Sequence, residues 1–557
     1  MEKIRFDNVT FRYPLGNTNA LENVDFSIKP SEFVVVCGKS GCGKSTLLRH
    51  MKKNLSPYGD LTGRVLIDGV EIEELDDRKN AAEIGFVQQN PDNQLVTDKV
   101  WHELAFGLEN LGVPNDVIKR QVAEMASYFG IQGWFRKNVA ELSGGQKQLL
   151  NLASVMAMQP DVLILDEPAS QLDPIAASDF LNTVYKINRD LGVTIVISEH
   201  RLEEVFPMAD RVIVMDKGKI LCDGAPKQVG KDLATLENGK AHPMYYGLPT
   251  VMKIFPETVF ATHEGEDLPL TMREGRILVE KLIGTRESKD EFVRENPTNS
   301  DASVTGKNTV LSIKNGWFKY SREGNYVLRG VNLKLEQGKI HCLLGGNGSG
   351  KSTTLKALMD IVTLQKGKVV KADGLKLAMV PQNPQAVFTE ITAEEEIFEA
   401  MTYMDIPIDE KIKRSEELLK LMEIEHLRKS NPYDLSGGEQ QRLAVGKIMS
   451  LEPDILLLDE PTKGLDPFFK MTMGKIMQSL RDKGVTIFMV SHDIEFCAEY
   501  GDYCSMFFDG EIISTGSSKE FFTGNNFYTT TANLILKKHS KDVVTWKEAR
   551  EWLSERV

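Results

Sequence analysis

The chain has 557 residues, of which 41% are hydrophobic and 26% charged, and its formal net charge is −13. This length predicts three or four domains, and the acidic balance argues against a protein that wraps nucleic acid through its phosphates. No apolar run approaches the roughly 18 residues of a membrane span, and the first residues lack the apolar stretch of a signal peptide. Six cysteines without a C-x-x-C pair predict buried thiols in a reducing cytoplasm.

Short strands expected at 3–6 and 23–28 lead to a loop of the pattern G-x-x-x-x-G-K-[ST], which follows an apolar strand at 33–37. The pattern returns 307 positions later, after a strand expected at 340–344. Its glycines let backbone N–H groups form one concave nest for phosphates, its lysine reaches the terminal phosphates and its serine can ligate Mg²⁺. The predicted nucleotide contacts are Gly38, Ser40, Gly41, Gly43, Lys44, Ser45 and Thr46, and Gly345, Asn347, Gly348, Gly350, Lys351, Ser352 and Thr353.

Two further features accompany each loop. Tyr13 and Tyr320 precede the loops by about 25 residues, and an aromatic ring there can stack on a purine, an ordinary core position being the alternative. After each loop a strand ends in a glutamine followed by Asn-Pro, which stops regular structure. The amide oxygens of Gln89 and Gln382 can ligate Mg²⁺.

Helices expected at 96–111 and 114–129 are followed by Leu-Ser-Gly-Gly-Gln, and the second half repeats it as Leu-Ser-Gly-Gly-Glu. The spacing is that of a helix-capping box, so a well-capped helix is one interpretation. Two copies favour the other, in which Ser-Gly-Gly leaves backbone N–H groups free for a phosphate. The predicted contacts are Ser143, Gly144, Gly145 and Gln146, and Ser436, Gly437, Gly438 and Glu439.

Each half then has a continuous apolar run closed by Asp-Glu, as in a parallel strand buried on both faces. Its carboxyl end is where open α/β sheets bind ligands, so the aspartate can support Mg²⁺ and the glutamate can polarise a water. A second apolar strand ends in a histidine, interpreted as a phosphate contact, 33 or 32 residues after the glutamate. The predicted metal ligands are Ser45, Gln89, Asp166, Ser352, Gln382 and Asp459, and the predicted catalytic residues are Glu167, His200, Glu460 and His492.

Equal spacings indicate a duplication. The glutamine precedes the signature serine by 54 residues in both halves, and the serine precedes the glutamate by 24 in both. The interval from the loop lysine to the glutamine is 45 residues in the first half and 31 in the second. The second half therefore lacks about one hairpin at this point.

Together these motifs resemble the nucleotide-binding subunits of ABC ATPases, over about residues 1–228 and 309–525. More specific segments, such as Gln89–Gln94 and Ala105–Asn110, resemble those of the ATPases of energy-coupling factor importers, which take up vitamins and metal ions in prokaryotes. In those importers two ATPase domains drive a transmembrane coupling subunit that carries a separate substrate-binding membrane protein. Here the resemblance implies that the two ATPases would be fused.

The resemblance implies an α/β fold of two P-loop ABC-type domains, each with a mainly parallel core sheet, an antiparallel β subdomain and a helical subdomain. It implies ATP and Mg²⁺ as cofactors, with each ATP between the loop of one half and the signature of the other, so that Lys44 pairs with Ser436 and Lys351 with Ser143. The two glutamates would be general bases and the two histidines γ-phosphate contacts. The chain would act peripherally on the cytoplasmic face of the cell membrane, with the coupling subunit and the substrate-binding membrane protein as partners and no nucleic acid.

Two departures separate the halves. Glu439 stands where the family has glutamine, which keeps the capping box but places a carboxylate near the phosphates, so we expect the site with Lys44 to close less readily. Arg442 matches the family, but the equivalent residue of the first half is Leu149.

The predicted domains are a first ATPase domain, an extension with a flexible polar linker, a second ATPase domain and a helical tail, at 1–228, 229–308, 309–525 and 526–557. The apolar pieces before residue 285 are expected to fold onto the first half. The tail begins with a capping box at Thr545 and places Trp546, Ala549 and Leu553 on one helical face. That face would pack on its own domain or on a partner.

Two other functions stay open. One is a soluble ABC ATPase that acts on ribosomes, although the near-neutral linker and acidic chain do not suit RNA. The other is the ATPase subunit of an exporter. In this family the membrane subunits contact the cargo, so the chain carries no signal for the transported substrate.

Overall fold

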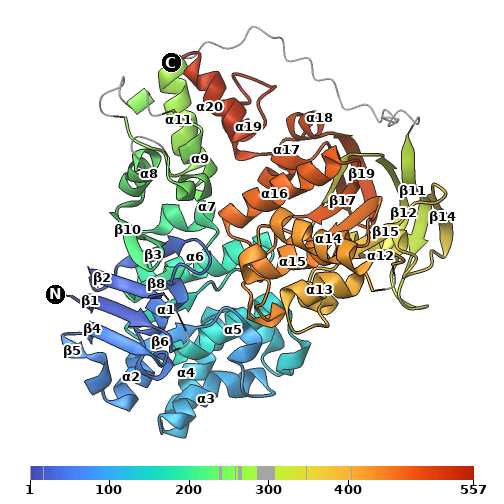
Figure 1. The fold of residues 1–557 in the computed structure, drawn as a ribbon. Coiled ribbons are helices and arrows are strands. Elements are labelled where there is room, and N and C mark those ends of the chain that lie inside the picture. The colour runs from blue at the N-terminus through green and yellow to red at the C-terminus, as the bar shows by residue number, and fades with distance from the viewer. Residues whose placement is uncertain are drawn as a thin grey trace. The chain divides into compact units, whose positions relative to one another are not determined.

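The computed structural model describes residues 2–557 apart from 15, 17, 237–240, 257–258, 261–265, 285–307, 347 and 403. The linker expected at 285–308 and the predicted contact Asn347 therefore lie, except for residue 308, outside the described residues. The chain divides into two compact units, Met1–Pro249 and Thr250–Val557. Each unit contains one copy of the repeated motifs (Figure 1).

The first unit contains two sheets. An antiparallel sheet has the strand order β2-β1-β4-β5, and a core sheet has the order β10-β9-β3-β8-β7-β6. All neighbours in the core sheet are parallel except β10 and β9. The strands are β1 (Ile4–Arg12), β2 (Leu21–Ile28), β3 (Phe33–Gly38), β4 (Asp60–Ile67), β5 (Val70–Glu71), β6 (Ile84–Val87), β7 (Val162–Asp166), β8 (Thr194–Ser198), β9 (Arg211–Asp216) and β10 (Lys219–Gly224).

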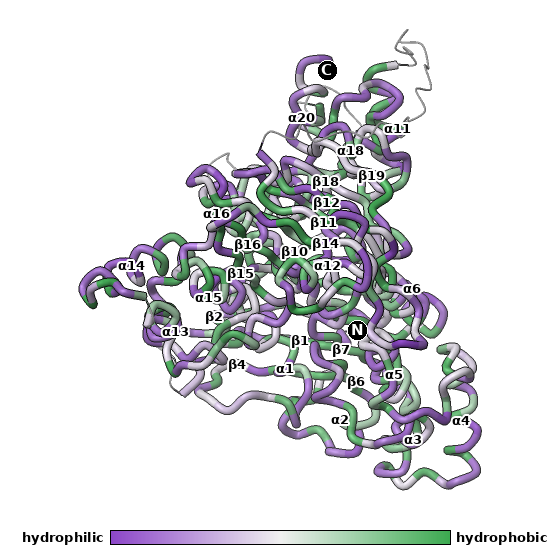
Figure 2. The backbone as a smooth tube through the Cα atoms, turned by 90° about the vertical axis from the view of Figure 1, so that its right-hand side faces the viewer, coloured by the Kyte–Doolittle hydropathy of each residue, from purple (hydrophilic) through white to green (hydrophobic). Residues whose placement is uncertain are grey.

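Continuous apolar sequence explains the centre of this sheet. Every residue of β3, β7 and β8 is buried, as expected for parallel strands covered on both faces. Of these strands, β7 is labelled in Figure 2, and its first four residues are hydrophobic. Helix α1 packs on β3, β7 and β8, so the phosphate loop that precedes it lies at the carboxyl end of β3.

Three helices of the first unit, α3, α4 and α5, contact one another and form its helical subdomain. The helices of the unit are α1 (Lys44–Arg49), α2 (Asp77–Glu83), α3 (Val100–Asn110), α4 (Asn115–Tyr128), α5 (Gly144–Ala157), α6 (Pro174–Leu191), α7 (Leu202–Val205) and α8 (Pro226–Thr235), with short 3₁₀ turns that include η2 (Ile72–Glu74), η3 (Pro91–Asn93) and η7 (Pro243–Gly247).

The second unit repeats this plan. Its antiparallel sheet has the order β12-β11-β14, and its core sheet has the order β15-β16-β17-β13-β18-β19, parallel except between β18 and β19. The strands are β11 (Thr309–Phe318), β12 (Leu328–Glu336), β13 (Ile340–Leu344), β14 (Lys366–Lys371), β15 (Leu377–Val380), β16 (Ile455–Asp459), β17 (Thr486–Ser491), β18 (Tyr503–Phe508) and β19 (Glu511–Ser517).

Helices α13, α14 and α15 form the helical subdomain of this unit. Its helices are α9 (Thr250–Lys253), α11 (Met272–Ile283), α12 (Lys351–Leu358), α13 (Ala393–Ala400), α14 (Ile408–Leu421), α15 (Gly437–Met449), α16 (Pro467–Asp482), α17 (Ile494–Tyr500), α18 (Ser518–Gly524), α19 (Thr531–Leu536) and α20 (Trp546–Ser554), with 3₁₀ turns that include η8 (Pro384–Val387). The two units confirm the predicted fold class.

The length difference between the halves has a local explanation. In the first unit, β5, η2 and α2 occupy residues 70–83 between the antiparallel sheet and β6. In the second unit, where residues 366–380 are all described, β14 is followed directly by β15. The segment is thus a short strand, a 3₁₀ turn and a helix rather than a hairpin alone.

The segment after the first ATPase domain is divided between the two units. Residues up to Pro249 belong to the first unit, as expected, whereas helices α9 and α11 belong to the second, where they contact α19 and α20 of the C-terminal tail (Figure 1). Gly275 of α11 makes this packing close, because a Cβ there would lie 2.7 Å from Val251 and 3.1 Å from Ile535. Ala549 and Leu553 of α20 are fully buried, and the predicted capping box at Thr545 is present.

Among the described residues, no helix is both long and apolar enough to cross a bilayer. All six cysteines are buried free thiols, as predicted.

Candidate active sites

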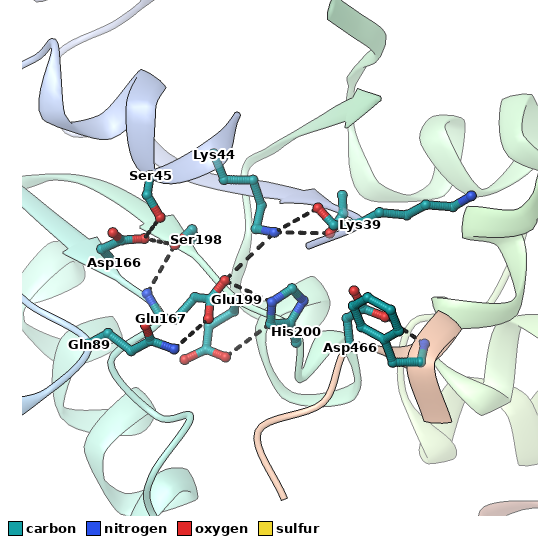
Figure 3. Close-up of polar contacts among 12 residues, drawn as sticks. Lys39, Lys44, Ser45, Gln89, Asp166, Glu167, Ser198, Glu199, His200 and Asp466 are labelled. Carbon is teal, nitrogen blue, oxygen red and sulfur yellow. Dashed lines mark hydrogen bonds and ion pairs between the residues drawn. The ribbon is translucent and has the colours of Figure 1, made fainter. Parts of the chain in front are cut away.

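The lysine of the first phosphate loop is buried at the start of α1. Its Nζ donates to the backbone oxygens of Gly38 (3.1 Å) and Lys39 (3.2 Å), and it lies 3.6 Å from Glu167 Oε1 (Figure 3). Gly43 has a φ of 106°, and a Cβ there would lie 2.4 Å from the backbone oxygen of Ala20. The position directly before Lys44 therefore requires glycine.

The aspartate that ends β7 lies beside the loop serine. Ser45 Oγ donates to Asp166 Oδ1 (3.0 Å), and Ser198 Oγ, from the end of β8, donates to the same oxygen (2.8 Å). Burial raises the pKa of Asp166, although the two hydroxyls lower it. A buried carboxylate held only by neutral hydroxyl donors would be stabilised by a cation at this point.

The glutamate after β7 is held by charged and polar groups from three elements. His200 Nε2 lies 2.7 Å from Glu167 Oε1, and Gln89 Nε2 donates to Glu167 Oε2 (2.9 Å). Burial favours the protonated acid, but His200 and Lys44 prevail and lower the pKa of Glu167 to about 2. Its backbone has a φ of 45°, a left-handed conformation that is strained for a non-glycine residue and that recurs at active sites.

The second unit repeats these contacts. Lys351 Nζ donates to the backbone oxygens of Gly345 (2.9 Å) and Gly346 (2.8 Å). Ser352 Oγ donates to Asp459 Oδ1 (3.0 Å), and burial raises the pKa of Asp459.

The glutamate and histidine of the second unit also meet. His492 Nε2 lies 2.6 Å from Glu460 Oε1 and 3.4 Å from Lys351 Nζ. Burial opposes ionisation, but contact with His492 lowers the pKa of Glu460. Glu460 has a φ of 51°, so the left-handed backbone of the first site is repeated.

The two predicted purine-stacking aromatics are attached to the phosphate-loop helices. The Tyr13 hydroxyl lies 3.0 Å from Thr46 Oγ1, and the Tyr320 hydroxyl lies 3.1 Å from Thr353 Oγ1. Tyr13 is 37% exposed and Tyr320 is 62% exposed. Neither side chain is buried in a core, so both rings remain candidates for stacking on a purine.

The signatures begin α5 and α15. In the first, Gln146 N donates to Ser143 Oγ (3.3 Å) and Ser143 N donates to Gln146 Oε1 (3.0 Å). In the second, the carboxylate of Glu439 accepts both from Ser436 N (2.9 Å) and from Ser436 Oγ (2.7 Å). Both signatures form capping boxes, and the Ser436 hydroxyl has in addition a charged acceptor in its own helix.

Two residues of the first site were missed from the sequence. Ser198 joins Asp166 to the backbone of Glu167, whose N–H it accepts (3.0 Å). Glu199 is buried and accepts from the backbone N–H groups of Ala169 (2.9 Å) and His200 (3.1 Å). The signal for Glu199 was the one-residue difference in histidine spacing, 33 against 32.

The donor atoms beside the loops fit Mg²⁺. In each unit a serine hydroxyl lies 3.0 Å from an aspartate carboxylate, and Mg²⁺ prefers such oxygens and completes its shell with phosphates and waters. The amide nitrogen of Gln89 faces Glu167, so its oxygen is the atom that can ligate a cation. Within the described ranges, no group of three or more His, Cys, Asp or Glu residues could hold a metal by itself.

The fold and these two clusters define a duplicated P-loop ATPase. The family model described as "ABC transporter" matches residues 21–170 and 328–463, the regions from the antiparallel sheets to the Asp-Glu pairs. The chain belongs to the ABC transporter family of ATP-binding proteins, and it is an ATPase with two fused ABC domains.

Relatives match over nearly the whole length. An ABC transporter ATP-binding protein of Bacillus anthracis is 40% identical over 98% of this chain and 97% of its own. One of Methanosarcina mazei is 33% identical over 93% of this chain and 90% of its own. Neither name specifies a substrate. Among solved structures, cbiO1 of Clostridium perfringens, described as part of the ABC transporter complex cbiONQ, is 33% identical and covers 42% of this chain and 91% of its own, with a TM-score of 0.39.

Proposed function

We propose that the protein is the ATP-hydrolysing energy-coupling subunit of a membrane importer of the energy-coupling factor type. One observation carries the catalytic part of this proposal. In both units a glutamate in a left-handed backbone conformation meets a histidine from the neighbouring strand, at 2.7 Å and 2.6 Å. Both halves therefore keep a complete set of catalytic groups, and we infer that both hydrolyse ATP.

Each ATP would lie between the phosphate loop of one half and the signature of the other. In this arrangement Lys44 shares a nucleotide with Ser436, and Lys351 with Ser143. This pairing rests on the resemblance to ABC ATPases; within each half the loop precedes α1 or α12, and the signature begins a different helix, α5 or α15. Tyr13 and Tyr320 would stack on the adenine rings.

The chain's own groups would position a water for in-line attack on the γ-phosphate. Glu167 is ionised, since its pKa is about 2, so it can orient the water and accept its proton. His200 holds the carboxylate and would contact the γ-phosphate. Lys44 would exchange its loop oxygens for phosphate oxygens, and bound Mg²⁺, held by Ser45 and Asp166, would neutralise charge on the phosphates.

Glu439 makes the two composite sites unequal. Both serines belong to capping boxes, but Ser436 also donates its hydroxyl to the Glu439 carboxylate (2.7 Å). To bind a phosphate, the Ser436 hydroxyl must leave a charged acceptor and the phosphate must approach a like charge. We infer that the site of Lys44 and Ser436 closes less readily than its counterpart.

The transport role rests on the resemblance of the segments around Gln89 and Ala105 to importer ATPases. The partners would be a transmembrane coupling subunit and a substrate-binding membrane protein, on the cytoplasmic face of the membrane. The cargo class would be a vitamin or a metal ion.

Single substitutions test the catalytic part. Glu167→Gln and Glu460→Gln should each lower the steady-state ATPase rate of the full chain, because removal of a positioned general base typically reduces a rate by about 10²–10⁴-fold at the affected site. Wild-type affinity for a nucleotide analogue should remain. An unchanged rate for either variant would remove that glutamate from its role.

Purification from detergent-solubilised native membranes tests the transport part. We expect the tagged chain to retain one coupling subunit and a small substrate-binding protein, both integral to the membrane. Recovery with a membrane protein that binds cargo without such a separate subunit would favour an exporter, and recovery with ribosomes would overturn the transport role.

A further inference from the structure

The helices that begin at the two signatures, α5 and α15, are attached to different parts of their own domains. Leu149 of α5 and Arg442 of α15 occupy equivalent positions, six residues after the signature serines. The sequence offers no reason for this difference. The structure gives a reason: Arg442 makes hydrogen bonds and a cation–π contact that the aliphatic side chain of Leu149 could not make.

Arg442 joins α15 to the carboxyl end of α14. Its side chain is 4% exposed, and its Nη1 donates to the backbone oxygens of Met422 (3.0 Å) and Glu423 (3.3 Å), the residues that end α14. The carboxylate of Glu423 lies 3.7 Å from the same nitrogen. A buried arginine so placed satisfies the carbonyl of the C-cap residue, Met422, and that of the residue after it.

Arg442 also joins α15 to α16. Its guanidinium lies 4.6 Å from the centroid of the Phe469 ring, within range of a cation–π interaction. That ring covers the second signature, because a Cβ on Gly438 would lie 2.5 Å from Phe469 Cδ2. Gly438 is buried, and one surface thus links the signature, Arg442 and the first turn of α16.

The first unit has small residues at these positions. Gly130, Leu149 and Ala176 stand where the second unit has Glu423, Arg442 and Phe469. A Cβ on Gly145 would lie 3.3 Å from the Cβ of Ala176, which leaves the first signature in lighter contact with its own α6.

Helix α5 is attached to the segment after Gln89 instead. Gln148 Nε2 donates to the backbone oxygen of Gln88 (3.1 Å), and Asn151 Nδ2 donates to that of Pro91 (3.3 Å). Lys147 Nζ forms an ion pair with Asp92 (2.6 Å).

The second unit has a weaker form of this attachment. The residues equivalent to Lys147 and Asp92 are Gln440 and Gln385, which share one amide hydrogen bond (3.3 Å). The cationic attachments nearest the two signatures, Lys147 and Arg442, thus lead to different elements, and α15 has a further one in Lys447, which pairs with Glu396 of α13.

We propose that Arg442, acting with Phe469, is a positioning residue that fixes the second signature on its own catalytic core. The first signature is instead positioned by the segment around Gln89, residues 88–92. In the head-to-tail arrangement of the proposed function, on which this inference rests for the choice of site, Arg442 orients Ser436 toward the nucleotide held by Lys44.

Substitution by the residues of the first half tests this role in the full chain. Arg442→Leu and Phe469→Ala should each raise the half-saturating ATP concentration at least fivefold, with less than a twofold change in the maximal rate, because ordering the signature then accompanies nucleotide binding. Glu460→Gln and Glu167→Gln backgrounds isolate the two sites, and the effect should occur in the Glu460→Gln background. Arg442→Lys, which keeps the charge, should recover part of the affinity.

Leu149→Ala is the matched control and should leave half-saturation within twofold in both backgrounds. An effect confined to the Glu167→Gln background would support the positioning role and overturn the head-to-tail pairing. Unchanged kinetics for both Arg442→Leu and Phe469→Ala would overturn the proposal. So would equal losses at both sites with a lowered melting temperature, since that result indicates a purely structural contact. If Arg442→Leu fails to fold, the same kinetic measurements on Phe469→Ala alone test the proposal.

Discussion

The second glycine of each signature, Gly145 or Gly438, has a different amount of space for a methyl group. Substitution of each by alanine tests this difference in packing. At Gly438 a Cβ would lie 2.5, 2.8 and 3.0 Å from three atoms of the Phe469 ring, so the ring must move and lose its contact with Arg442. At Gly145 the nearest atom is the Ala176 Cβ, at 3.3 Å, and a shift of a few tenths of an ångström is enough.

We expect Gly438→Ala to destabilise the second unit relative to the effect of Gly145→Ala on the first. Overpacking of a core typically destabilises by about 1–3 kcal/mol, and both variants share the gain of about 1 kcal/mol from alanine in a helix. The difference between them is therefore about 1–3 kcal/mol. At roughly 2–4 °C per kcal/mol for domains of this size, the melting temperature of the second unit should fall by several degrees more.

Differential scanning calorimetry suits this test because it can resolve separate transitions of a protein with two units. The double variant Gly438→Ala/Phe469→Ala should regain most of the lost stability, since the ring that the new methyl group meets is then absent. Equal shifts for the two glycine variants, or no recovery in the double variant, would refute the packing argument.

Two further predictions concern charge and the C-terminal helices. The pKa of Glu167, about 2 in the folded chain against an ordinary 4.5, contributes stability that is complete above about pH 4.5 and is lost as the pH falls toward 2. In urea denaturation, the free energy of unfolding of the wild type should therefore fall by about 1 kcal/mol more than that of Glu167→Gln between pH 6 and about pH 3.5. Equal decreases in the two proteins would contradict the ion pairing. Gly275→Ala should separate α11 from α9 and α19 and speed their amide exchange roughly tenfold. Gly524→Ala, which meets nothing within 4 Å, is the control, and equal exchange in both variants would count against the packing.

Much of the fold follows from local patterns. The apolar strands before the loops and the Asp-Glu pairs were predicted because continuous hydrophobic runs suit buried parallel strands, and β13 spans the expected residues 340–344. The helix starts followed from capping boxes at Ser143 and Thr545. Residues close in sequence determine these features, so spacing alone reveals them.

The packing of the segment after the first ATPase domain could not be predicted in this way. Its helices, α9 and α11, have apolar faces that several surfaces could cover, and their partner, α19, begins at Thr531, far along the chain. The choice between surfaces depends on shape, such as the closeness that Gly275 allows. Glu199 was missed for a similar reason, because one of its two backbone partners, Ala169, lies in a loop 30 residues earlier in the sequence.

By itself the sequence determined that this protein has two phosphate loops, two Asp-Glu pairs and two signatures, since each motif is a short run whose chemistry depends on residue type and spacing. Only the tertiary structure decided how unequal the halves are. In the sequence, Arg442 and Leu149 are a single difference between equivalent positions of the two halves. Its structural effect depends on Met422 and Phe469, which folding brings into contact with Arg442. Contacts between distant residues depend on packing, and packing is a property of the folded chain.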